Sequence, residues 1–295
     1  MRVTQGMLAG NSLRHLSNNY SKMDKYMDQL ATNKKITRPS DDPVVAMKGM
    51  FYRTNLSEVE QYKRNLSEVY QWMENSESGI EHSTQVLHRV RELVVQAQNG
   101  TNSPEDLNSI KVEITQLKED LANVANTKVA GRYIYNGNDT SKPPVTLGNP
   151  IGVSMDTGDF TVEVSKGVQL KANVNPINAF GGIVDGKSLF ATLESLETAL
   201  GSGSLGDSSY LDLLDQHFSN MSAERSDLGA RHNRLDLISD RVNSQEIIAT
   251  RILSDNEDAD VERVITNLKT QESVLRASLS ASARIIQPTL MDFLR

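Results

Sequence analysis

The chain has 295 residues, enough for one large domain or two ordinary ones, and a formal net charge of −7 at pH 7. It contains no Cys, which excludes disulfides, thiolate metal sites and cysteine nucleophiles. The acidic balance argues against a nucleic-acid partner, because binding to a phosphate backbone depends on Lys and Arg. No apolar run approaches the roughly 20 residues of a membrane span, so we expect no membrane insertion. The first residues lack the apolar core of a signal peptide, so we expect a cytoplasmic protein or export without a cleavable signal.

The first predicted helix carries a heptad pattern of apolar residues. They alternate by four and three positions, which places them along one seam of a helix. The seam consists of Ala9, Leu13, Leu16, Tyr20, Met23, Met27 and Leu30. Such a narrow stripe does not stabilise a helix by itself, so another helix has to cover it. Pro39 and Pro43 end the segment, because a helix does not continue through two closely spaced prolines.

The same spacing returns in later stretches of the chain. Residues 44–98 predict a single helix about 80 Å long. After a loop at 99–102, Ser103 and Pro104 predict the start of another helix, with a cap and then a proline in the first turn. Helical patterns resume at 188–200 and 210–253. The last predicted helix has a stripe made of Val261, Ile265, Leu268, Leu275, Leu279, Ile286, Leu290 and Phe293.

Residues 138–186 differ in composition from the helical stretches. Four of the eight prolines lie between Pro143 and Pro176. Apolar and polar residues alternate at 160–164 and at 168–174, with Lys166 and Gly167 as a turn between them. This pattern predicts a small antiparallel β insertion.

The whole pattern predicts a mainly α fold. We expect a long antiparallel helical rod or coiled coil built from both chain ends, with the β insertion in the middle. The predicted domains are residues 1–40 plus 256–295 as an inner coiled coil, 41–137 plus 188–255 as a helical rod, and 138–187 as an outward-facing β insertion. Neither terminal seam belongs to a core that the rest of the chain forms. We therefore expect the terminal helices to pair with each other and with neighbouring copies.

No constellation of polar residues predicts an enzyme, and we expect no metal and no cofactor. His82 and His88 are six positions apart, so they do not face one metal as an i, i+4 pair would. Asp255, Glu257 and Asp260 weakly suggest a calcium loop, but the central Gly and the final Glu are missing. The start of a helix, where acidic residues are favourable, explains these carboxylates better. An enzyme or ligand-binding protein on a helical stalk stays open as an alternative.

Separate motifs occur in order at both ends of the chain and before the insertion. They are Met1 to Leu13, Ile36 to Pro43, Gly131 to Gly137, Leu228 to Leu235, Asp258 to Asp260 and Leu290 to Leu294. Together they resemble the bacterial flagellin family. Two of them, Pro39-Ser40-Asp41-Asp42-Pro43 and the ending at 289–294, are more similar to the hook–filament junction proteins of this family than to flagellin itself.

The resemblance implies a structural adapter of the bacterial flagellum. Such an adapter joins the zone of hook-associated protein 1 to the flagellin filament by packing of its terminal helices. The resemblance also implies self-assembly, an export chaperone, secretion by the flagellar type III apparatus and a place outside the cell at the hook–filament junction. The alternative within the family is flagellin itself. The expected assembly interface comprises Leu13, Leu16, Tyr20, Met23, Met27, Leu30, Val261, Ile265, Leu268, Leu275, Leu279, Ile286, Leu290 and Phe293.

Overall fold

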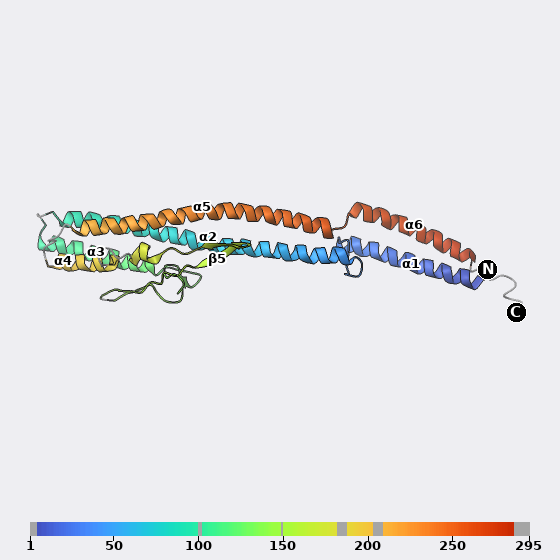
Figure 1. Ribbon diagram of the computed structural model, residues 1–295, viewed down its shortest axis with the longest axis horizontal. Helices are drawn as coiled ribbons and strands as arrows, with labels where there is room; N and C mark the ends of the chain where they lie inside the picture. The colour runs from blue at the N-terminus through green and yellow to red at the C-terminus, as the bar shows by residue number, and fades with distance from the viewer. Residues whose placement is uncertain (1–4, 100–101, 149, 182–187, 203–208, 286–295) are drawn as a thin grey trace. The chain divides into compact units, whose positions relative to one another are not determined.

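The structure, a computed structural model, describes residues 5–99, 102–148, 150–181, 188–202 and 209–285. The predicted fold class is confirmed: long helices come from both ends of the chain, and short antiparallel strand pairs lie in the middle of the sequence (Figure 1). The helices are α1 (Gln5–Thr32), α2 (Pro43–Ala97), α3 (Pro104–Ala125), α4 (Leu189–Gly201), α5 (Ser209–Glu257) and α6 (Val261–Ile285), with a π-helical turn η1 (Ile177–Gly181). The strand pairs are β1 (Lys128–Val129) with β2 (Arg132–Tyr133), β3 (Val145–Thr146) with β4 (Gly152–Val153), and β5 (Thr161–Ser165) with β6 (Val168–Lys171).

The chain forms two compact units. The terminal unit comprises residues 1–58 and 245–295, and the central unit comprises residues 59–244. The division into three domains expected above stays a prediction. Among the described residues, no helix is both long enough and apolar enough to cross a membrane.

The central unit has a hydrophobic core of its own. Its largest fully buried side chains include Trp72 from α2, Ile114 from α3 and Phe190 from α4. Ion pairs connect the helices around this core, between Arg89 and Glu113 and between Arg91 and Asp215. The helices of this unit are therefore amphipathic elements that cover one another's apolar faces.

Helix α3 begins where the sequence predicts it. The Ser103 hydroxyl accepts a hydrogen bond from the Asp106 backbone N–H at 3.2 Å, and the Asp106 carboxylate accepts one from the Ser103 backbone N–H at 3.0 Å. This reciprocal capping box satisfies backbone donors that the first turn leaves unpaired. Pro104 fits the first turn because no helical partner exists there for an N–H.

The β insertion packs on the helices. Val164 and Leu170 of the β5–β6 hairpin are buried, and the ring of Phe160 lies 4.9 Å from that of Trp72 on α2. Gly167, in the turn of this hairpin, has a φ of +72°, which a residue with a side chain rarely adopts. The hairpin predicted from alternation is thus present, and its apolar face completes the core of the central unit.

A buried polar cluster joins the segment after β6 to α5. The Glu224 carboxylate accepts hydrogen bonds from the Asn175 backbone N–H at 2.7 Å and from the Asn178 side chain at 3.1 Å. The Arg231 guanidinium donates to the Asn173 carbonyl at 2.6 Å and pairs with Asp227 at 2.9 Å. Because an irregular segment leaves backbone groups without ladder partners, these side chains supply the missing partners.

We expect Ile114→Ala to lower the free energy of unfolding of the protein by about 2–4 kcal/mol, because it leaves a cavity in the core. Ile114 is fully buried, whereas Val112 on the same helix is 57% exposed. The matched control Val112→Ala should change stability by about 0.5 kcal/mol or less. Urea unfolding followed by circular dichroism measures both values, and equal losses would contradict the assignment of this core.

His217 predicts a pH dependence of stability. It is buried beside Thr192, and burial lowers its pKa from 6.5 to about 4. Between these two values the unfolded chain binds a proton that the folded chain does not bind, so stability falls as the pH decreases from 6.5 towards 4. We expect this loss to be smaller in His217→Leu than in the natural chain, by up to about 3 kcal/mol. Urea unfolding across this pH range measures it, and parallel curves for the two proteins would show that His217 does not contribute.

Candidate assembly surface

Helices α1 and α6 of the terminal unit form an antiparallel pair. Leu16, Met23 and Leu30 of α1 are half-buried along this contact, and Leu275 of α6 is buried. Polar contacts fix the register, because the Asn19 side chain donates to the Ser278 hydroxyl at 3.2 Å. It also accepts a hydrogen bond from the Gln271 side chain at 3.1 Å. The two terminal helices therefore cover part of each other's predicted seam.

The rest of the predicted seam stays exposed. On α1 the side chains of Leu13, Tyr20 and Met27 are each about half exposed or more, with 61%, 49% and 53% of their surface accessible. On α6 the exposed members are Val261, Ile265 and Leu279, whereas Leu268 is half-buried. Ile286, Leu290 and Phe293 lie outside the described residues. The single seam predicted for each helix is thus divided between an inner part and an uncovered part.

The uncovered residues gather on one flank of the helix pair. Successive residues of an α-helix turn by about 100°, so positions seven apart lie nearly above one another. Leu13, Tyr20 and Met27 therefore share one flank of the face with which α1 contacts α6. By the same geometry Val261 and Ile265 lie on one flank of the α6 contact face, opposite the flank of Arg263. We call the exposed set Leu13, Tyr20, Met27, Val261, Ile265 and Leu279 the apolar flank.

The sequence pattern did not single out a further apolar face at the start of α2. Val44, Met47 and Phe51 are exposed and follow the three-four spacing of a helical stripe. They point away from Gly49, whose α-carbon faces α5 so closely that a Cβ would lie 2.6 Å from a Glu257 carboxylate oxygen. The spacing that begins directly after Pro43 was a signal for this stripe. By itself, that spacing predicts a helix that packs within its own domain.

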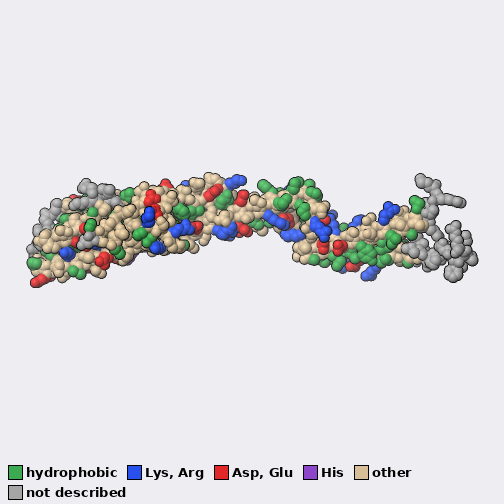
Figure 2. All heavy atoms as spheres, turned by 90° about the horizontal axis from the view of Figure 1, so that it is seen from below, with side chains coloured by type: hydrophobic (Ala, Val, Ile, Leu, Met, Phe, Trp, Pro, Cys, Tyr) green, Lys and Arg blue, Asp and Glu red, His purple; other side chains and the backbone are tan. Residues whose placement is uncertain are grey.

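Most of the exposed large apolar side chains of the protein belong to the terminal unit. Of the twenty such residues in the described part of the chain, sixteen lie in the terminal unit and four in the central unit. Figure 2 shows hydrophobic side chains gathered along the surface of the terminal unit. Soluble monomers rarely expose large contiguous apolar patches, so this surface is typical of one that another protein covers.

A buried carboxylate connects the segments within the terminal unit. Glu257, at the end of α5, pairs with Arg53 of α2 at 2.7 Å and with Lys34 at 3.5 Å. Lys34 also pairs with Asp258 at 2.7 Å, and this contact raises the pKa of Lys34 and lowers that of Asp258. Backbone hydrogen bonds from Lys35 to Glu257 and from Ala259 to Asn33 join the same two loops. The α1–α6 pair is thereby tied to the adjoining ends of α2 and α5.

The acidic stretch 255–260 is explained by these contacts. The Asp260 carboxylate accepts a hydrogen bond from the Arg263 backbone N–H at 3.1 Å, so it caps the start of α6 as the helix-start interpretation predicted. Glu257 and Asp258 are engaged in the ion pairs described above. Within the described ranges, no three His, Asp or Glu side chains are placed to hold a metal ion together.

The comparisons identify the family of this helical architecture. Residues 3–140 match the bacterial flagellin N-terminal helical region, and residues 211–294 match the bacterial flagellin C-terminal helical region. The chain belongs to the bacterial flagellin family. Flagellar hook-associated protein 3 of Escherichia coli strain K12 is 26% identical, and the match covers 95% of this chain and 96% of that protein.

Other members of the flagellin family are similar over less of the chain. Flagellin of Bacillus subtilis strain 168 is 27% identical over 80% of this chain and 80% of its own length. The crystal structure of flagellar hook-associated protein 3 from Legionella pneumophila has a TM-score of 0.63 at 16% identity. It covers 70% of this chain and 98% of the Legionella chain, and it shows that the fold is shared.

We expect the double variant Tyr20→Asp with Met27→Asp to be excluded from assembled flagella, because two carboxylates on the apolar flank would have to be buried without partners. The central unit should keep its helicity and melting temperature, since its core lies elsewhere. Blots of sheared flagella and of culture medium measure incorporation and secretion separately. A matched control is Thr266→Asp with Ser273→Asp, two exposed polar positions seven apart on α6, which should incorporate normally. Normal incorporation of the first variant would show that the apolar flank stays uncovered in the flagellum.

Proposed function

We propose that the chain is a structural adapter of the bacterial flagellum at the junction between hook and filament. The observation that carries this proposal is the match to hook-associated protein 3, which extends over nearly the whole of both chains. The match to Bacillus flagellin leaves a fifth of each chain uncovered. A structural role, without catalysis, agrees with a surface whose main feature is uncovered apolar side chains.

Assembly would bury the apolar flank between neighbouring copies. Fully burying one Leu or Met side chain contributes about 1.5–3 kcal/mol, whereas association costs at least about 4 kcal/mol in lost freedom of motion. Several such residues per copy are therefore required, and the apolar flank supplies six of the nine large apolar side chains that are exposed on the described parts of α1 and α6. We propose the fourteen seam residues predicted above, including Ile286, Leu290 and Phe293, as the assembly interface, with the inner members joining α1 to α6 and the exposed members facing other copies.

The proposed partners follow from this position in the flagellum. Copies of the chain would pack on one another, on hook-associated protein 1 towards the hook and on flagellin towards the filament. Before assembly, an export chaperone would cover terminal apolar residues, and the flagellar type III apparatus would deliver the chain to the outside of the cell. The absence of Cys suits transfer as an unfolded chain, because no disulfide has to form or break.

The second candidate function is that of flagellin, the filament subunit, because Bacillus flagellin and hook-associated protein 3 are about equally identical to this chain. The two functions differ in self-propagation. Purified flagellin extends filaments from seeds, whereas a junction adapter should stop after a limited layer. Electron microscopy of seeded mixtures distinguishes them: long filaments made of this chain alone would favour flagellin.

Deletion of the gene tests the adapter function directly. We expect hooks without filaments and unpolymerised flagellin in the culture medium, because flagellin would lack the surface on which it assembles. Electron microscopy and blots of the medium measure the two effects, and a plasmid copy of the gene is the control for restoration. Filaments of normal length in the deletion strain would exclude an essential junction role.

A further inference from the structure

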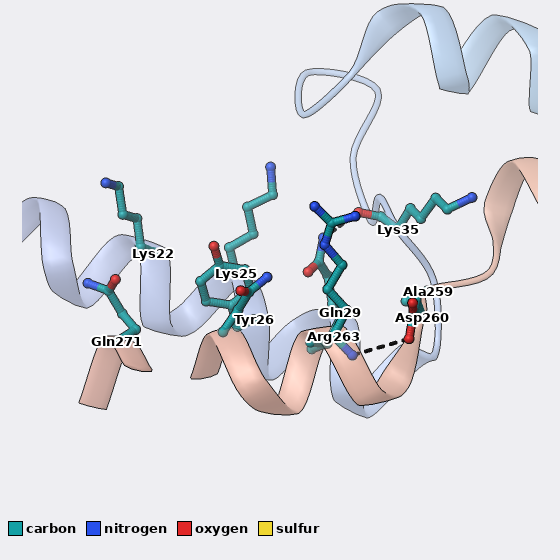
Figure 3. Close-up of a pocket in the computed structure, with 11 residues that line it drawn as sticks. Lys22, Lys25, Tyr26, Gln29, Lys35, Ala259, Asp260, Arg263 and Gln271 are labelled. Carbon is teal, nitrogen blue, oxygen red and sulfur yellow. Dashed lines mark hydrogen bonds between the residues drawn. The ribbon is translucent and has the colours of Figure 1, made fainter. Parts of the chain in front are cut away.

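The flank of the α1–α6 pair opposite the apolar flank carries a basic groove. This groove has a volume of about 580 Å³ and is lined by Lys22, Lys25 and Lys35 together with Arg263 of α6. Figure 3 shows Lys22, Lys25 and Arg263 extending in the same direction from the two helices. Tyr26, Gln29 and Gln271 also line the groove. The helix pair therefore has one apolar side and one basic side.

Three basic side chains of the groove are without an ion pair in the described part of the chain, because no carboxylate there pairs with Lys22, Lys25 or Arg263. Lys35 differs, since its ammonium donates a hydrogen bond to the Asp255 carbonyl. Asp260 is the acidic residue in the lining, and its carboxylate caps α6. A hydrogen bond from the Arg38 backbone N–H lowers the pKa of Asp41, and the charge of Lys25 acts in the same direction. Like charges gathered in one groove repel each other, so an acidic surface bound there would relieve the repulsion.

Two acidic residues, spaced along the helix much as Lys22 and Lys25 are, lie on the outer face of α1. Asp24 and Asp28 are exposed, and helical geometry places them on the side that faces away from α6. Within the part of the chain that the structure describes, neither carboxylate forms an ion pair. Their α-carbons are about 6 Å apart along the helix axis, and those of Lys22 and Lys25 are about 4.5 Å apart. Both pairs occupy the same turns of α1, so they lie at the same height on the helix.

We infer that the basic groove of one copy receives the Asp24–Asp28 face of α1 from a second copy. A lateral neighbour, related by rotation with little shift along the helix axis, would bring residues of equal height together. The groove and the acidic face are different surfaces, so the contact is head-to-tail and extends into a ring or a shallow helix. This inference rests on the proposed function and adds to it an electrostatic determinant of how neighbouring copies align.

Charge reversal tests the contact. Lys22→Glu with Arg263→Glu in the groove, or Asp24→Lys with Asp28→Lys on the face, should each lower incorporation into flagella at least tenfold. Combining all four substitutions in one chain should restore incorporation, because the two reversed positions of the groove then meet the two reversed positions of the α1 face. The matched control Lys269→Glu with Arg276→Glu changes the outer face of α6 and should incorporate normally. Circular dichroism of each purified variant checks that it folds.

Cysteine cross-linking provides a second measurement, and the natural chain contributes no Cys to the background. Cells that express Arg263→Cys and Asp28→Cys as separate chains should give a disulfide-linked dimer in isolated flagella after mild oxidation. Cells that express either chain alone should give little dimer. Cross-linking together with rescue by the fourfold variant supports the inference.

Two outcomes would overturn the inferred contact between the basic groove and the Asp24–Asp28 face. Normal incorporation of both double variants would show that neither charged surface matters. Loss caused by the groove variant alone, without rescue and without cross-linking, would show that the groove binds an acidic surface of another protein. The deletion phenotype keeps this test separate from the proposed function. Hooks without filaments in the deletion strain, together with normal incorporation of the charge variants, would reject the electrostatic contact and retain the adapter.

Discussion

The uncovered apolar side chains of the terminal unit are the constraint on which the rest of the structure depends. Two helices from opposite ends of the chain bury only the inner part of their seams against each other, as Leu16 and Leu275 do. A pair of helices has too little mutual surface to cover two stripes, so Tyr20 and Ile265 stay exposed. Hydrophobic burial grows with the area removed from water, and we propose that other chains supply the missing area here.

The helices of the central unit cover their apolar faces within one chain. Its helices are joined by ion pairs and share a core, and the β5–β6 hairpin covers part of that core. The buried contacts of Arg231 and Glu224 hold the segment that follows the hairpin. Since this unit buries its own apolar core, its apolar faces do not require another copy to cover them. An assembling subunit requires this separation, because stability and polymerisation then depend on different residues.

The ion pairs of Glu257 join the segments of the terminal unit to one another. The carboxylate contacts Arg53 and Lys34, which come from α2 and from the loop after α1. Because a buried charge is costly unless it is paired, these partners favour one arrangement of the four segments. The arrangement joins the start of α6 and the end of α1 to the adjoining ends of α2 and α5.

The sequence alone determined the helices, the caps and the antiparallel insertion, because these follow from local periodicity and from residues such as Ser103, Pro104 and Gly167. It also determined the family, through motifs at both ends. Only the tertiary structure decided which members of each seam face inwards, since that depends on the register of α1 against α6. It likewise revealed the stripe of Val44, Met47 and Phe51, and it brought Lys22 and Arg263 to one groove. A heptad defines one stripe per helix, but the flank that a partner helix leaves open is a property of the pair.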